Sequence, residues 1–191
     1  MLSDLTIPVG VLLGRHTRKP EDDAKLFSEL QAVGRHQEIV DTLRILEPRL
    51  TQLSVLVLGS IPMIYGDIGL GQLVPLPQMG EGLTRILSLA LEIGKSRHGV
   101  MLVDEIEHGL HHSVMVKVWQ AIIETAHKND AQVIATTHSW KCIQAAHAAF
   151  ATAGPEDFRL HRLERIKGEV QAITYDQESL ETSVEMNLEV R

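Results

Sequence analysis

Two adjacent carboxylates follow a short apolar run near the middle of the chain. The run Gly99–Val103 contains two β-branched residues, and Asp104 and Glu105 come directly after it. This pattern predicts a strand buried on both faces with acids at its carboxyl end, where ligands of open α/β sheets bind. An aspartate there can hold hydrated Mg²⁺, and the next glutamate can orient and deprotonate a water. Because acids are also common at a helix N-cap, the neighbouring motifs must distinguish a ligand site from a cap.

A second polar cluster follows another short apolar run. Val133–Ala135 predicts a second buried strand, and Thr136-Thr-His-Ser139 comes directly after it. Two neighbouring strand ends would then present Asp, Glu, Thr and His side chains to one crevice. His138 is therefore a further candidate, although a histidine at a strand end can also be structural.

A glycine-containing loop precedes an amphipathic helix. Gly80-Glu-Gly82 stands before an apolar stripe with helical spacing. Free N–H groups at the positive end of a helix form a natural anion site, and an ordinary turn is the alternative. Two other glycine segments lack the pattern of a phosphate loop. Gly66–Gly71 has no following lysine or helix, and Gly94-Lys-Ser96 follows a helix and lacks the earlier glycine.

The composition fits one α/β domain that positions these side chains. The chain has 191 residues, of which 44% are hydrophobic, and a formal charge of −7, which argues against a uniformly basic nucleic-acid surface. The single cysteine, Cys142, excludes an internal disulfide framework. The apolar run Ile7–Leu13 is too short to span a bilayer and no basic segment precedes it. We therefore expect a cytoplasmic protein without a membrane partner.

The periodicity predicts helices and strands in a definite order. Residues 1–20 receive no assignment, and residues 21–191 form the expected domain. Helices are predicted over residues 21–34, 36–46, 83–91, 114–125 and 141–150. A short antiparallel meander is predicted over residues 53–58, 62–65 and 73–76, and a hairpin over 158–163 and 169–175. The acidic tail from residue 176 is either a terminal helix or a frayed end.

The order of these motifs resembles the second half of an ATP-binding cassette nucleotide-binding domain. A glycine loop opens a helix, a strand ends in Asp-Glu, a Gly-Leu-His turn follows, and a later strand ends in Thr-His-Ser. More narrowly, the chain is similar to the "AAA family" ATPases related to SMC, RecF and the OLD nucleases, and Val103–His111 is the most specific piece. The resemblance implies the C-terminal lobe of a P-loop NTPase fold, a mostly parallel sheet flanked by helices, with ATP and Mg²⁺ as its ligands.

The resemblance also implies the chemical roles of three residues at the strand ends. Asp104 corresponds to the Walker B aspartate on the Mg²⁺ side, and Glu105 to the catalytic carboxylate beside the attacking water. His138 corresponds to the switch histidine near the γ-phosphate. These roles suit phosphoryl transfer, which needs charge neutralisation and an oriented water more than covalent chemistry.

Two further loops correspond to parts that cross a dimer interface in that family. Gly80, Glu81 and Gly82 match the signature loop, which touches the γ-phosphate of ATP held by the opposite protomer. Gly109 and His111 lie in the loop that crosses the interface. The implied partner is a second copy or a separate N-terminal ATPase lobe, and a DNA or nuclease partner would act through the full-length protein.

The chain departs from the family pattern at two points. Gln78 occupies the place of the usual signature serine, and the 191 residues contain no Walker A loop. Without that loop the chain lacks the backbone N–H groups and the lysine that hold the β- and γ-phosphates. We therefore expect the chain to be the C-terminal part of a larger ATPase and to be inactive alone.

Two other functions remain open from the sequence. A metal-dependent hydrolase could use Glu107, His108, His111 and His112, which lie with the two acids within nine positions, although His-Glu-x-x-His is absent. A non-catalytic interaction module with an ATPase-like fold is the second alternative, and the missing Walker A loop favours it.

Overall fold

Three strands of the molecule form a parallel sheet. The computed structural model describes residues 10–14, 18–154, 157–175 and 177–185. Strands β1 (Gly10–Leu13), β5 (Val100–Val103) and β6 (Gln132–Ala135) form a three-stranded sheet in the order β1-β5-β6. Both pairings are parallel. The sequence left residues 1–20 unassigned, and the structure places β1 of that segment at an edge of this sheet.

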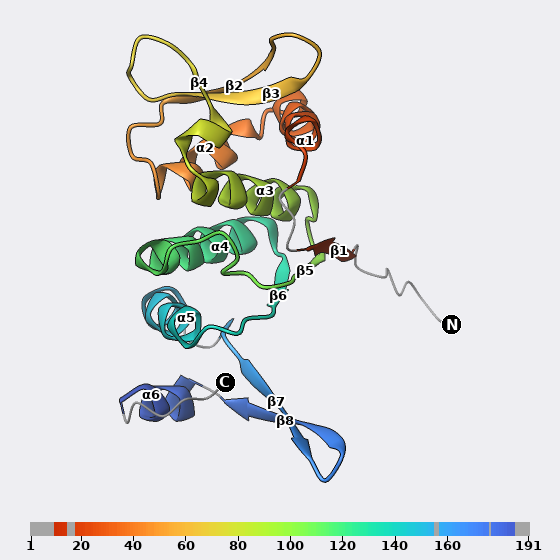
Figure 1. The fold of residues 1–191 in the computed structure, drawn as a ribbon, viewed down its shortest axis with the longest axis vertical. Coiled ribbons are helices and arrows are strands. Elements are labelled where there is room, and N and C mark those ends of the chain that lie inside the picture. The colour runs from red at the N-terminus through yellow and green to blue at the C-terminus, as the bar shows by residue number, and fades with distance from the viewer. Residues whose placement is uncertain (1–9, 15–17, 155–156, 176, 186–191) are drawn as a thin grey trace, which may run out of the picture.

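Helices cover one side of this sheet. Helices α3 (Glu81–Lys95), α4 (Met115–Asn129) and α5 (Trp140–Ala153) lie on the same side of the strands (Figure 1). Met101 and Val103 are buried on that side. The α/β fold class predicted from the sequence, a parallel sheet flanked by helices, is confirmed.

The remaining elements are antiparallel strand pairs and small helices. Helices α1 (Pro20–Ala32) and α2 (His36–Arg44) precede the meander of β2 (Gln52–Val57), β3 (Pro62–Asp67) and β4 (Val74–Pro75). A 3₁₀ turn, Leu76–Met79, then leads into α3. Strands β7 (Leu160–Ile166) and β8 (Glu169–Tyr175) form the hairpin, and helix α6 (Gln177–Glu185) follows it. The predicted meander and hairpin are therefore present, and the acidic tail begins as a helix.

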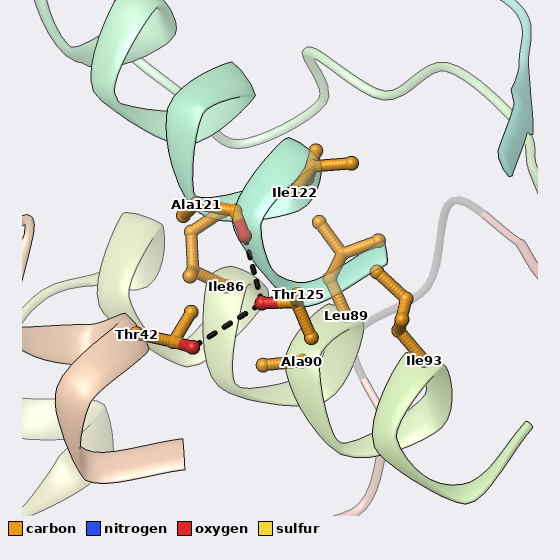
Figure 2. Close-up of a pocket in the computed structure, with 8 residues that line it drawn as sticks. All are labelled: Thr42, Ile86, Leu89, Ala90, Ile93, Ala121, Ile122 and Thr125. Atoms are coloured by element: carbon orange, nitrogen blue, oxygen red, sulfur yellow. Dashed lines mark hydrogen bonds between the residues drawn. The ribbon is translucent and has the colours of Figure 1, made fainter. Parts of the chain in front are cut away.

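Helix α3 is held between its neighbours and carries the glycine loop at its start. Figure 2 shows the junction where α2, α3 and α4 meet. At its centre the hydroxyl oxygens of Thr42 and Thr125 lie 3.2 Å apart, and Thr125 donates to the Ala121 carbonyl at 2.7 Å. Apolar side chains of α3 and α4 surround this polar pair: Ile86, Leu89, Ala90, Ile93 and Ile122. Because these partners fix α3, the position of its N-terminus is fixed as well.

None of the helices in the described ranges combines the length and apolarity needed to cross a bilayer.

Candidate functional site

Hydrogen bonds continue beyond the ends of β5, joining it to the end of β1 and to the end of β6. The Asp104 N–H donates to the Leu13 carbonyl at 3.0 Å, and the Thr136 N–H donates to the Val103 carbonyl at 2.9 Å. The Ile106 N–H in turn donates to the Thr136 carbonyl at 3.0 Å. The two polar clusters expected at neighbouring strand ends therefore lie together at the carboxyl edge of the sheet.

The hydroxyl of Thr136 connects both acids. It donates to Oδ1 of Asp104 at 2.7 Å and accepts from the N–H of Glu105 at 2.9 Å. A hydrogen bond to a carboxylate is short and strong, so Thr136 orients Asp104 directly. The sequence placed Thr136 in the cluster but assigned it no such role, since nothing in the order of residues predicts which hydroxyl reaches which acid.

Glu105 adopts a backbone conformation that is unusual for its residue type. Its φ is 47°, in the left-handed region that favours glycine. Strained backbone of this kind is concentrated at functional sites. The Asp104 carboxylate accepts from Thr136, whereas the Glu105 carboxylate lies near His108 and His138, so the two adjacent acids have different neighbours.

The carboxylate of Glu105 lies between two imidazoles. Its Oε1 is 3.6 Å from Nε2 of His138, and its Oε2 is 3.9 Å from Nδ1 of His108. The Glu105 side chain is only 18% exposed, whereas that of His138 is 80% exposed. A half-buried carboxylate beside an exposed imidazole is suited to accept a proton from water and to share it with a neighbouring base.

Glu107 fixes the loop that carries His138. Its Oε1 accepts from the His138 N–H at 2.8 Å, and its Oε2 is buried without a hydrogen-bond partner. Burial, with a smaller contribution from the Glu107 charge, raises the pKa of the nearby Cys142 thiol to about 11. The sequence considered Glu107 only as a metal ligand, and the structure gives it this positioning contact instead.

Arg85 supports the strand ends from the helical side. Its buried guanidinium donates to the Gly14 carbonyl at 3.0 Å and to the Asp104 carbonyl at 3.5 Å. Burial lowers the pKa of this guanidinium. Sequence reasoning missed Arg85. An arginine within the apolar stripe of a helix could have drawn attention to it, because a buried cation needs partners.

The glycine loop packs against the turn that follows the acids. Gly109 has a φ of 73°, and a Cβ added to it would lie 2.7 Å from Oε1 of Glu81. A Cβ on Gly82 would lie 3.3 Å from the Leu110 side chain. Gly80 has a φ of 116°, and no side chain caps the helix that starts after it. Glu81, Gly82 and Gly109 thus lie in one contact region at the start of α3, and Gly80 directly precedes it in the chain.

His111 points to neighbours within its own turn. Its Nδ1 lies 2.9 Å from Oγ of Ser113, and its ring lies 4.1 Å from that of His112. The charge of Lys141, and then that of His111, lowers the pKa of His112. The contacts of His111 with Ser113 and His112 therefore lie within its own turn, away from the two acids and the glycine loop.

The hydrolase alternative needs a set of metal ligands. Within the described ranges no group of three or more His, Cys, Asp and Glu side chains has an arrangement that could hold a metal ion.

Comparison with known proteins identifies a family and a fold. The family model described as "AAA domain, putative AbiEii toxin, Type IV TA system" matches residues 6–140. No curated protein sequence matches the chain.

Solved SMC structures share the fold at low sequence identity. An SMC head bound to the C-terminal winged-helix domain of ScpA has a TM-score of 0.57 and 13% identity over 88% of this chain and 54% of its own. A chain from a study of ATP-driven dimerisation and DNA-stimulated activation of SMC ATPases has a TM-score of 0.51 and 15% identity, over 85% of this chain and 96% of its own. A Pyrococcus furiosus SMC head with an extended coiled coil, bound to the C-terminal domain of ScpA, has a TM-score of 0.53 and 13% identity, over 88% of this chain and 41% of its own. This chain thus spans about half of the first of these structures.

Proposed function

The chain belongs to the AAA-domain family described as putative AbiEii toxin of a type IV toxin–antitoxin system, and we propose that it is the part of an ATP-hydrolysing head that carries the catalytic acids. The observation that carries this proposal is the group formed by Asp104, Glu105 and His138 at the joined ends of β5 and β6. A scaffold has no chemical need to hold these three side chains together.

The donor set at the sheet edge fits Mg²⁺. This ion keeps several waters and takes one or two carboxylates, and Asp104 presents a carboxylate already oriented by the Thr136 hydroxyl. Bound Mg²⁺ would neutralise negative charge on the phosphates of ATP. Asp104 holds the ion in this proposal, and no other acid of the cluster is needed for that role.

Glu105 and His138 divide the remaining work. Glu105 orients a water and accepts its proton, because its carboxylate is half-buried and held by a fixed turn. His138, which is largely exposed, donates a hydrogen bond toward the terminal phosphate. Glu107 keeps His138 in place through the backbone contact.

A second polypeptide segment must hold the nucleotide. The 191 residues contain no Walker A sequence, so we propose that a lobe with this loop, or a head dimer that contains it, completes the site. The glycine loop Gly80–Gly82 and Gly109 would face ATP across the dimer interface. One solved SMC head supports this division, because this chain covers only 54% of it and leaves room in that head for a second lobe.

ATP turnover tests the proposal. The chain alone is expected to show no turnover, and the complex or longer polypeptide that includes a Walker A loop is expected to hydrolyse ATP with Mg²⁺. Glu105→Gln in that assembly should lower the rate by about 100-fold or more. Turnover by the isolated chain that Glu105→Gln abolishes would refute the need for a second lobe. ATP binding without turnover, unchanged by Glu105→Gln, would favour the interaction module.

A further inference from the structure

A cavity of about 210 Å³ lies between α1, β3 and the first two turns of α3, beside the 3₁₀ turn Leu76–Met79. These elements pack against one another at one end of the molecule (Figure 1). Most of the cavity wall consists of apolar side chains: Pro20, Met63, Ile64, Leu76, Pro77 and Leu87. An apolar cavity of about 150 Å³ can hold a benzene molecule, so this cavity has room for a small ring with a short arm.

The polar part of the wall has a buried carboxylate at its deep end. Asp23 lies deeper than Arg18, because its side chain is 4% exposed and that of Arg18 is 21% exposed. Oδ2 of Asp23 accepts a hydrogen bond from the Ser88 hydroxyl at 2.7 Å. Its Oδ1 is buried and accepts no hydrogen bond from the described residues, and Nε of Arg18 is 3.4 Å away. A buried carboxylate oxygen without a donor is costly, so a ligand that brings a donor to it would be favoured.

The charges beside the cavity do not balance. Arg18 also pairs with Glu92 of α3, so one guanidinium faces two buried carboxylates. Burial raises the pKa of Asp23 to about 6, although the hydrogen bond from Ser88 and the charge of Arg18 both act in the opposite direction. At pH 7 the group therefore carries an excess of negative charge, which a bound cation would neutralise.

We propose that this cavity binds a small organic cation, an ammonium group attached to an apolar body about as large as a benzene ring. The ammonium group donates to Oδ1 of Asp23, and the apolar body fills the space between α1, β3 and α3. An organic anion fits less well, because it would bring a third negative charge to Asp23 and Glu92. Water alone would find polar partners at one end of the cavity only.

Three probes of similar size and different charge test the proposal at pH 7.5: benzylamine, benzyl alcohol and benzoate. Each is titrated into the 191-residue chain, and binding is followed by the amide resonances of the ¹⁵N-labelled protein. Benzylamine should bind saturably and shift the resonances of the cavity wall. The glycine loop should shift as well, because the hydroxyl of Thr84 in the wall donates to the Gly80 carbonyl at 3.3 Å. Benzyl alcohol should bind about tenfold more weakly or less, because it lacks the charge, and benzoate should not bind.

Two substitutions at adjacent positions test the role of Asp23. Asp23→Asn removes the charge and keeps the shape of the side chain, so benzylamine should bind about tenfold more weakly or less, and binding of benzyl alcohol should be unchanged. Asp22→Asn is the matched control, because Asp22 is exposed and lies outside the cavity wall, and benzylamine binding should be nearly unchanged. If Asp23→Asn binds neither probe, the comparison of the three probes on the wild-type chain decides alone.

The pH dependence of binding provides an independent readout. The charged groups around Asp23 are Arg18, Asp22 and Glu92. The ammonium group requires the ionised form of Asp23, so the affinity for benzylamine should fall by about tenfold from pH 7 to pH 5, and Asp23→Asn should remove this change. Absence of saturable benzylamine binding, equal affinity for benzyl alcohol, binding of benzoate, or shifts confined to other parts of the chain would each overturn the proposal.

Discussion

Replacing Glu105 by glycine is expected to give a more stable fold than replacing it by alanine, although both changes remove the proposed catalytic carboxylate. The φ of Glu105 is 47°, in the region where an L residue costs about 1–2 kcal/mol. Glycine avoids this cost but loses more chain entropy on folding, by about 0.4–1 kcal/mol. Relative to Glu105→Ala, which removes the same carboxylate and keeps the strain, Glu105→Gly should therefore be more stable by about 0.5–1 kcal/mol.

Urea unfolding followed by far-UV circular dichroism measures this difference. Asp130 provides a matched control, because its φ is 48° and it lies at the far end of α4. The free energy of unfolding of Asp130→Gly should exceed that of Asp130→Ala by a similar amount. If glycine gains stability over alanine at position 130 but not at position 105, the left-handed turn at Glu105 does not hold in solution, and the argument for a strained catalytic carboxylate fails.

Three further changes test other parts of the site and its support. Thr136→Val removes one hydrogen bond to a carboxylate and one from an N–H. Because Thr136 is exposed, the free energy of unfolding should fall by only about 1–2 kcal/mol. Thr136→Ser keeps the hydroxyl and should recover most of this loss. Gly109→Ala should lower the free energy of unfolding by about 1 kcal/mol, because the φ of Gly109 is 73°. The added methyl group also meets the Glu81 side chain, which adds a second cost. A double-mutant cycle with Glu81→Ala measures this second cost, because it vanishes when the Glu81 side chain is removed. Burial raises the pKa of Asp23 to about 6, so the stability that its protonation contributes is fully present below the unfolded pKa near 4 and is lost as the pH rises through 6. Asp23→Asn cannot ionise and should therefore gain about 2–3 kcal/mol over the wild type between about pH 4 and pH 8 in unfolding experiments; a difference that does not change with pH would contradict this pKa.

Local patterns of residues were sufficient for most elements of the fold. The helix over residues 83–91 is contained in α3, and the strand before Asp104 is β5, because apolar spacing and the polar residues that end each run are local properties. The short strand β1 could not be assigned from the sequence. It has four residues and no period, and it becomes a strand only because it pairs with Val100–Val103.

The sequence by itself determined which chemical groups stand at the strand ends: two acids after one strand and a threonine–histidine cluster after the next. Only the tertiary structure decided how these groups meet. The register of β5 and β6 brings Oε1 of Glu105 to 3.6 Å from Nε2 of His138, and the Thr136 hydroxyl to 2.7 Å from Asp104. The same register aligns the exposed side chains of Leu12, Leu102 and Ile134 across one face of the sheet. Contacts between residues more than thirty positions apart depend on strand pairing, which no local pattern specifies.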